Sequence, residues 1–235
     1  MKAIRLSRKT HKWFALVLGI QLFLWALSGF YMVAVHIDII HGDMLVGNME
    51  HGVAQPGGTQ IPFDHIGDAY PDARSITLKT MMSRPVYRVE GTDIRLVDAS
   101  TGELLSPLDE QLATDIATFH YAGEASIKRV SLIESNPPTE LQTRALPLWR
   151  VDFDDVWNSS FYVDPSSGEF TTRRHTLWRV FDFLWMLHVM DYEERENINN
   201  SVLRIFSVLG TLMGLSGVWL LFYSFNTGRK RSLTQ

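Results

Sequence analysis

Two uncharged apolar runs near the ends of the chain constrain its fold more than any other feature of the sequence. The first run extends from Trp13 to Val35 and contains 23 residues without a charge. A helix of that length, rising about 1.5 Å per residue, would reach about 35 Å and could cross the hydrocarbon core of a bilayer. The second run, Ile205 to Phe225, is also uncharged and about long enough to span. The sequence therefore predicts two transmembrane helices, over residues 13–35 and 199–226.

The placement of charge predicts how these helices are oriented. All 26 acidic residues lie between Asp38 and Glu196, and the segments outside this window carry only basic charges. The basic clusters adjoin the start of the first run and the end of the second, so the positive-inside rule places the tails, residues 1–12 and 227–235, in the cytoplasm. Residues 36–198 would then form an extracytoplasmic domain. Because the first run is longer than the apolar region of a signal peptide, we interpret it as an uncleaved anchor.

The composition excludes several classes of function. The chain has no cysteine, which rules out disulfides, thiolate metal sites, iron–sulfur ligation, covalent c-type haem and cysteine nucleophiles. Its net charge is −4, and its basic residues are either in the tails or interleaved with acids, so nucleic acid is not an expected partner. The chain also lacks H-E-x-x-H, G-x-S-x-G and P-loop motifs. Any redox chemistry would need a bound cofactor.

Two stretches of the middle segment repeat one another. The first runs from Val86 to Glu103 and the second from Leu148 to Glu169, and each contains two strand patterns followed by the turn D-x-S-x-G-E. The Asp, Ser and Gly of this turn serve its backbone geometry, so we interpret them as architecture and not as catalytic groups. Helical patterns precede the strands near residues 62–70 and 108–120. The prediction is an α+β domain of two helix-plus-antiparallel-hairpin repeats between the transmembrane helices.

An aromatic-rich helical pattern covers about residues 176–192. On a helical wheel Leu177, Phe181, Leu184 and His188 share a face. Tryptophans favour the membrane interface, so we expect this helix to lie at the outer interface.

Small residues in the predicted spans suggest close helix packing. Both spans contain Leu-Ser-Gly, and the second also contains Gly210 and Gly214 in a small-xxx-small arrangement. Two interpretations stay open: the glycines pack the two spans of one chain together, or they form the face of a dimer.

The order of these motifs resembles a known family. Arg8-Lys-Thr-His-Lys-Trp13 opens an apolar helix that ends in Leu27-Ser28-Gly29, the D-x-S-x-G-E turn occurs twice, and Leu187-His188 precedes a final helix with another Ser-Gly. Over nearly the whole chain this combination resembles the PepSY-associated transmembrane proteins. The resemblance implies a bacterial inner-membrane protein with a periplasmic, PepSY-like domain. Larger members include ferric-siderophore reductases, believed to carry haem b between histidines near helix ends.

By this resemblance His11 and His188 match the histidines of the two family motifs, and His36 is a further candidate ligand. A haem b site needs two facing imidazoles. On one helix His11 and His36 would be about 37 Å apart, so they cannot hold the same haem. Three pairings stay open: His11 with its copy, His188 with its copy, and His188 with His36. The alternative is that His11 adds to the basic cluster and His188 is a polar tip of an interfacial helix.

We expect the other five histidines on the surface or in loops: His41, His51, His65, His120 and His175.

These features lead to three functional hypotheses. The first is a haem-b-binding electron-transfer subunit linked to the reduction of ferric iron or a siderophore. This subunit would be a homodimer in the bilayer or would pair with another membrane redox protein. The two predicted spans and the lack of a flavin- or nicotinamide-binding domain depart from the reductase pattern, and this favours a component of a membrane ferric reductase over an independent enzyme. The alternative is a non-catalytic periplasmic binding or regulatory module, restraining a peptidase or docking a partner. The third is a sensor or assembly factor in iron uptake.

Overall fold

The computed structural model describes residues 2–47 and 60–231 of the chain. It consists of two compact units. A helical unit comprises Met1–Val35 and Phe181–Gln235, and a larger α+β unit comprises His36–Val180. The stretch from Gly42 to Thr59 is rich in glycine and ends in Gln-Pro-Gly-Gly near residue 58, a composition that predicts a loop. It falls largely on residues 48–59, which lie outside the described residues, as does His51.

The helical unit contains two long helices, α1 (Lys2–Ala34) and α6 (Ser201–Arg231). Within the described residues one helical segment, Ala15–Ala34, is apolar and long enough to cross a membrane, with a mean hydropathy of 1.9. Only 17% of its apolar window is buried within the protein, so it is not the core helix of a soluble domain. The second predicted span lies on α6, a continuous helix of 31 residues. Most side chains beyond Leu215 lie outside the described part, so this span stays a prediction.

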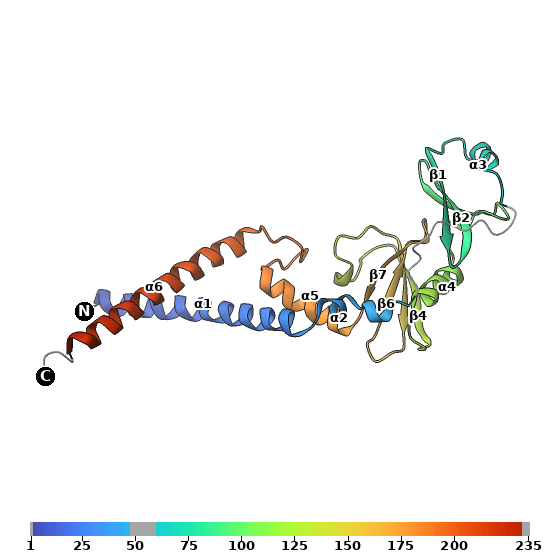
Figure 1. Ribbon diagram of the computed structural model, residues 1–235. Coiled ribbons are helices and arrows are strands. Elements are labelled where there is room, and N and C mark those ends of the chain that lie inside the picture. Colours follow the sequence, from blue (N-terminus) through green and yellow to red (C-terminus); the bar gives the residue numbers. More distant parts are fainter. Residues whose placement is uncertain (1, 48–59, 232–235) are drawn as a thin grey trace. The chain divides into compact units, whose positions relative to one another are not determined.

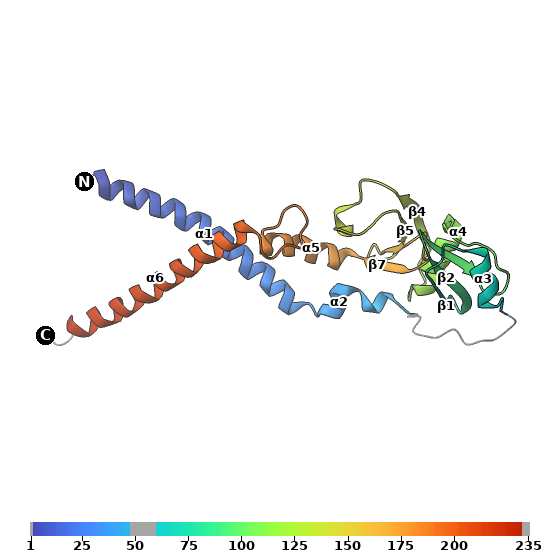
Figure 2. The same cartoon turned by 90° about the horizontal axis from the view of Figure 1, so that it is seen from above.

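Figures 1 and 2 show the two long helices α1 and α6 of the helical unit. They approach each other at Gly210. A Cβ atom at Gly210 would lie 3.8 Å from the Trp25 ring and 3.9 Å from the Leu22 side chain of α1. At Gly214 such an atom would meet nothing within 4 Å. Of the two interpretations of the small-residue motif, packing within one chain is therefore confirmed at Gly210, whereas Gly214 has no neighbour of this kind among the described residues.

The larger unit contains two antiparallel sheets, labelled in Figure 1. The first sheet has the order β1-β2-β3, and the second has the order β4-β5-β6-β7. The prediction of an α+β fold is confirmed. The strands are β1 (Ser75–Met81), β2 (Arg84–Glu90), β3 (Ile94–Asp98), β4 (Ile127–Ile133), β5 (Leu148–Phe153), β6 (Ser160–Val163) and β7 (Phe170–Arg174). The helices are α2 (Ile37–His41), η1 (Asp43–Leu45), α3 (Phe63–Ala69), α4 (Glu110–His120), η2 (Thr139–Leu141) and α5 (Thr176–Val189).

Each predicted hairpin is present but belongs to a larger sheet. The first hairpin is β2–β3, with Tyr87 opposite Val97, and the second is β5–β6, with Val151 opposite Phe161. The strands β1, β4 and β7, all edge strands, were not predicted from the sequence. In β4 and β7, charged and polar residues of the kind that discourage pairing with other chains weaken the hydrophobic alternation, whereas β1 alternates, with Ile76 and Leu78 between polar residues. Strand β7, for example, reads FTTRR.

The two D-x-S-x-G-E turns have the architectural role that the sequence predicts. Asp98 accepts hydrogen bonds from the backbone N–H groups of Ser100 and Thr101, and Asp164 does the same for Ser166 and Ser167. The glycines of both turns have positive φ angles, +76° at position 102 and +67° at position 168, which other residues adopt only at a cost.

Helix α4 lies between the two sheets (Figure 1) and joins their cores. Asp109 caps its start by accepting a hydrogen bond from the Leu112 N–H at 2.8 Å. Ile116 of α4 packs in one hydrophobic cluster with side chains of both sheets, Leu96 of β3 and Phe161 of β6 among them. The two repeats therefore share one hydrophobic cluster within the α+β unit, and each sheet has a smaller cluster of its own.

A buried network of charged groups ties the start of α5 to the second sheet. Glu140 is 7% exposed, and its carboxylate accepts hydrogen bonds from the Arg179 guanidinium, at 2.5 Å from Nε, and from the Tyr162 hydroxyl. Arg179 also donates to the Ser160 hydroxyl at 2.9 Å. Burial alone would raise the pKa of Glu140, but the Arg179 and Tyr162 hydrogen bonds and the nearby guanidinium charges outweigh it and hold the pKa below its ordinary value.

Candidate functional site

The candidate site is built around His188, the residue before the last of α5. The helix begins at Thr176, as the sequence predicts, but ends at Val189 instead of near residue 192. Met190 has a φ angle of +55°, and this left-handed conformation terminates the helix. His188 is half-buried in the last turn of α5.

A hydrogen bond to α1 fixes the orientation of the His188 ring. The Ser28 hydroxyl lies 2.8 Å from His188 Nδ1, and it donates its own proton to the Leu24 carbonyl of α1 at 2.7 Å. Since that proton is committed, we infer that Nδ1–H is the donor and Ser28 Oγ the acceptor. A neutral imidazole protonated at Nδ1 has its lone pair on Nε2. This is the tautomer in which histidine binds a metal through Nε2, with Nδ1 held by an outer partner.

Polar side chains from neighbouring segments cap the end of α5. The Trp25 indole N–H donates to the His188 carbonyl at 2.8 Å, and the Gln21 amide donates to the Leu187 carbonyl at 3.3 Å. The Asn200 amide donates to the Val189 carbonyl at 2.8 Å. The last carbonyls of a helix lack partners within it, and leaving them unpaired is costly away from water. These bonds therefore hold His188 in place through its own backbone.

Aromatic rings and a buried ion pair complete the surroundings. The Trp185 ring is nearly parallel to the His188 ring, with centroids 6.4 Å apart and an interplanar angle of 8°, and the Trp25 centroid is also 6.4 Å away. The Trp185 indole donates to the Arg195 carbonyl at 3.0 Å, and Arg195 pairs with the Asp182 carboxylate, which is 4% exposed. The loop before α6 is thus fastened to α5.

The sequence analysis did not single out the partners of His188. Ser28 and Gln21 are nevertheless the only clearly polar residues of the first apolar run, and both are buried, at 0% and 7% exposure. A buried polar group in an apolar helix normally has a hydrogen-bond partner, so their presence was the available signal.

The other two predicted ligands lie in different settings. His11 lies on α1, 17 residues before Ser28, which corresponds to about 25 Å along a helix. His11 and His188 therefore cannot hold the same haem within one chain. The side chain of His11 lies outside the described part. His36 caps the start of α2, where its Nδ1 accepts from the Asp38 N–H at 3.4 Å and lies 3.3 Å from the Asp38 carboxylate. It is well exposed, and no apolar pocket encloses it.

Of the predicted ligands whose side chains are described, His188 is the one with a ring nitrogen held by a buried partner, and it is therefore the residue that would hold a haem iron. In the described part of the chain no group of three His, Asp or Glu side chains is placed to hold a metal ion. The second axial ligand would have to come from another histidine or another chain.

Two histidines expected on the surface are buried instead. His120 is 9% exposed and stacks on Phe170, with ring centroids 5.0 Å apart. His175 is fully buried, with its Nε2 3.0 Å from the Ile40 carbonyl oxygen, and burial lowers its pKa. The expectation was wrong for His120, because it is the last residue of α4 and that helix packs into the core. His175 lies in the loop between β7 and α5, as expected, but is buried there.

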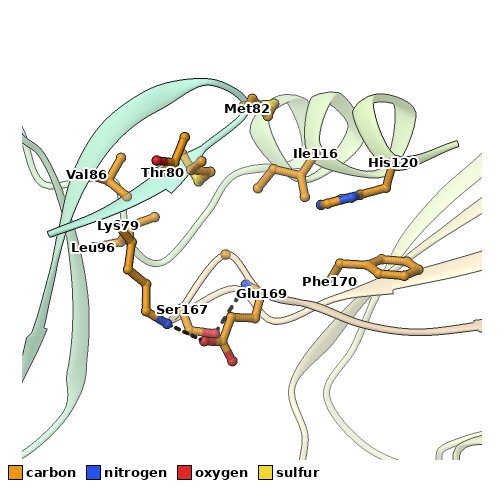
Figure 3. Close-up of a pocket in the computed structure, with 12 residues that line it drawn as sticks. Lys79, Thr80, Met82, Val86, Leu96, Ile116, His120, Ser167, Glu169 and Phe170 are labelled. Carbon is orange, nitrogen blue, oxygen red and sulfur yellow. Dashed lines mark hydrogen bonds and ion pairs between the residues drawn. The ribbon is translucent and has the colours of Figure 1, made fainter. Parts of the chain in front are cut away.

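A second candidate site is a pocket of about 310 Å³ between the two repeats (Figure 3). Edge strand β1 and its turn form one side through Lys79 and Met82, and Ile116 and His120 reach into it from α4. The D-x-S-x-G-E turn of the second repeat, with Glu169, closes the opposite side.

Comparison with known proteins gives one match. The family described as "PepSY-associated TM region" matches residues 8–235, which is nearly the whole chain. No curated protein and no solved structure matches significantly.

Proposed function

The chain belongs to the family of PepSY-associated TM regions, and from this premise we propose that it is a haem-b-binding membrane subunit that transfers electrons. The observation that supports the proposal most directly is the 2.8 Å contact between Ser28 Oγ and His188 Nδ1. It leaves Nε2 of His188 available to bind iron. Bound haem would supply one-electron transfer, and His188 would hold its iron. The resemblance to ferric-siderophore reductases suggests ferric iron as the final acceptor.

The source of the second haem ligand determines which assembly we propose. His11 lies too far along α1 from Ser28, the partner of His188, to share a haem with His188 of the same chain. The second ligand would therefore be His188 of a second copy, or His36. A homodimer supplies two identical imidazoles without a further protein, and another membrane redox protein is the alternative. The bilayer itself contacts the exposed apolar side chains of α1, such as Phe23 and Phe30.

We propose the topology that the charges predict: two spans in a bacterial inner membrane, cytoplasmic termini and a periplasmic α+β unit. The absence of native cysteine makes a clean test, since a single introduced cysteine is then the only thiol. A membrane-impermeant maleimide should label Thr92→Cys in intact spheroplasts and should label Ser232→Cys only after permeabilisation. Labelling of Ser232→Cys in intact spheroplasts would contradict the second span.

Absorption spectroscopy tests the haem proposal. The protein is purified in detergent from cells with sufficient haem supply, and oxidised and dithionite-reduced spectra are compared. The wild type should show a sharp α-band on reduction. His188→Ala should lose it, while the matched control His65→Ala, at an exposed residue of α3, should retain it. Ser28→Ala should keep the ligand but bind haem about tenfold more weakly, because it removes the group that orients the ring.

A wild-type spectrum without haem bands under these conditions would overturn the proposal. The anchored binding module would then be the better function, and the pocket between the two repeats is the specific observation that favours it.

A further inference from the structure

Apolar side chains form one part of the lining of the pocket between the two repeats. Val86 and Leu96 line it from the first sheet and Ile116 from α4, and Met81 and Met82 add two thioether side chains. Methionine sulfur makes favourable contacts with aromatic rings and adapts to irregular shapes. This part of the lining therefore favours contact with an apolar, polarisable part of a ligand.

One wall of the pocket is flat. The rings of His120 and Phe170 stack with an interplanar angle of 26° and centroids 5.0 Å apart, and both line the pocket (Figure 3). A planar ring placed against this wall can stack on it in the same offset manner.

At the polar end of the pocket one carboxylate bridges two cations, of which Lys79 lines the pocket. Glu169 Oε1 lies 2.8 Å from Lys79 Nζ and 2.6 Å from Arg88 NH1, so two cations share one carboxylate. Glu90 also pairs with Arg88, whereas the Lys79 side chain is 40% exposed and can turn toward a ligand. An incoming carboxylate would find a cation here without the need to bury an unpaired charge.

The turn that carries Met82 is held in an unfavourable conformation. Met82 and Ser83 connect β1 to β2 with φ angles of +47° and +64°, where two-residue hairpins strongly favour Asn-Gly. Non-glycine residues at such angles cost free energy and are often found at ligand clamps. The methionine side chain, which a glycine would lack, packs against the shared core and lines the pocket.

We propose that this pocket binds a small planar aromatic carboxylate, with the ring between the Phe170–His120 wall and the methionines and the carboxylate on Lys79. The pocket volume of about 310 Å³ is roughly twice that of a cavity of about 150 Å³ that takes up benzene. A body of one or two fused rings therefore fits. The inference depends only on the α+β unit and is independent of haem binding at His188.

The test uses 2-naphthoate as the probe and 2-naphthamide as its neutral counterpart. The full-length protein is placed in lipid nanodiscs, and binding is followed by saturation-transfer difference NMR, with empty nanodiscs as the blank. Both probes should bind to the wild type. Lys79→Met should weaken naphthoate binding about threefold to fivefold, the range expected for a partly exposed ion pair, and should leave the amide unchanged.

Two further variants sharpen the result. Glu169→Gln removes the carboxylate that competes for Lys79, so it should tighten naphthoate binding. The matched control Lys128→Met changes an exposed lysine of β4 that does not line this pocket and should change nothing. Thermal unfolding of each variant checks that it is folded. Absence of saturation transfer to naphthoate in the wild type, or equal naphthoate affinity in wild type and Lys79→Met, would overturn the proposal.

Discussion

Removal of the charge of Glu140 should destabilise the α+β unit strongly. In Glu140→Gln the side chain keeps its size but no longer neutralises Arg179, whose guanidinium bonds it through Nε and NH2. Loss of one partner of a buried pair costs about 3–5 kcal/mol. Because the Arg179 side chain is 31% exposed and water can solvate part of it, we reduce this to about 2–4 kcal/mol. For a domain of about 150 residues that loss lowers Tm by roughly 5–15 °C.

The assay is thermal unfolding of the detergent-solubilised protein, followed by fluorescence of the tryptophans in the α+β unit. The matched control is Glu90→Gln, which breaks the 3.0 Å contact with Arg88 Nε at a carboxylate that is 47% exposed. An exposed pair contributes about 1 kcal/mol or less, so the control should shift Tm by only about 2–4 °C or less. Equal shifts for the two variants would refute the reasoning that burial sets the strength of the Glu140 pair.

Three further predictions concern pH, backbone conformation and helix capping. The folded-state pKa of Glu140 lies below its ordinary value of 4.5, so the contribution of Glu140 to stability is complete above that value and is lost as the pH falls through the folded-state pKa. The stability of Glu140→Gln should therefore depend less on pH in the acid range than that of the wild type, as acid unfolding curves measure. Gly42→Ala should destabilise the α+β unit by about 1–3 kcal/mol, because φ is +73° and the new Cβ would lie 2.9 Å from His175 Cδ2; an unchanged Tm would contradict this. Trp25→Phe removes the indole bond to the His188 carbonyl and should weaken haem binding without abolishing it, as measured by haem retention during gel filtration.

The amphipathic and turn patterns of the sequence predict the inner strands and the edge strand β3, and miss the edge strands β1, β4 and β7. The strands β2, β3, β5 and β6 lie inside the sheets or against the core, where burial imposes apolar residues. In contrast, β4 reads IKRVSLI and is mostly exposed or half-exposed. An edge strand is defined by backbone pairing with its neighbour, and its side chains report little of that pairing. The sheet sizes could not therefore be read from hydrophobic pattern.

In the candidate site, too, the sequence identifies single residues but not the contacts between residues far apart in the chain. The resemblance to a family identifies His188, and the charge-free run identifies the helix that carries Ser28. Their contact joins residues 160 positions apart, and hydropathy gives no indication of which polar groups meet. The pocket between the repeats is of the same kind, because its walls come from β1, α4 and the turn after β6. In the sequence its residues look like ordinary core and turn residues, and only the three-dimensional arrangement of the two sheets shows that they line one pocket.

Haem titration tests the central claim that His188 of α5, oriented by Ser28 of α1, is a haem ligand. Haem is added in steps to the haem-free protein in lipid nanodiscs, and the Soret band is recorded for wild type and His188→Ala against empty nanodiscs. The account predicts saturable binding with fixed stoichiometry for the wild type and loss of that phase in His188→Ala. Identical titrations for the two proteins would contradict it, because the orientation of the imidazole would then serve only to fasten α5 to α1.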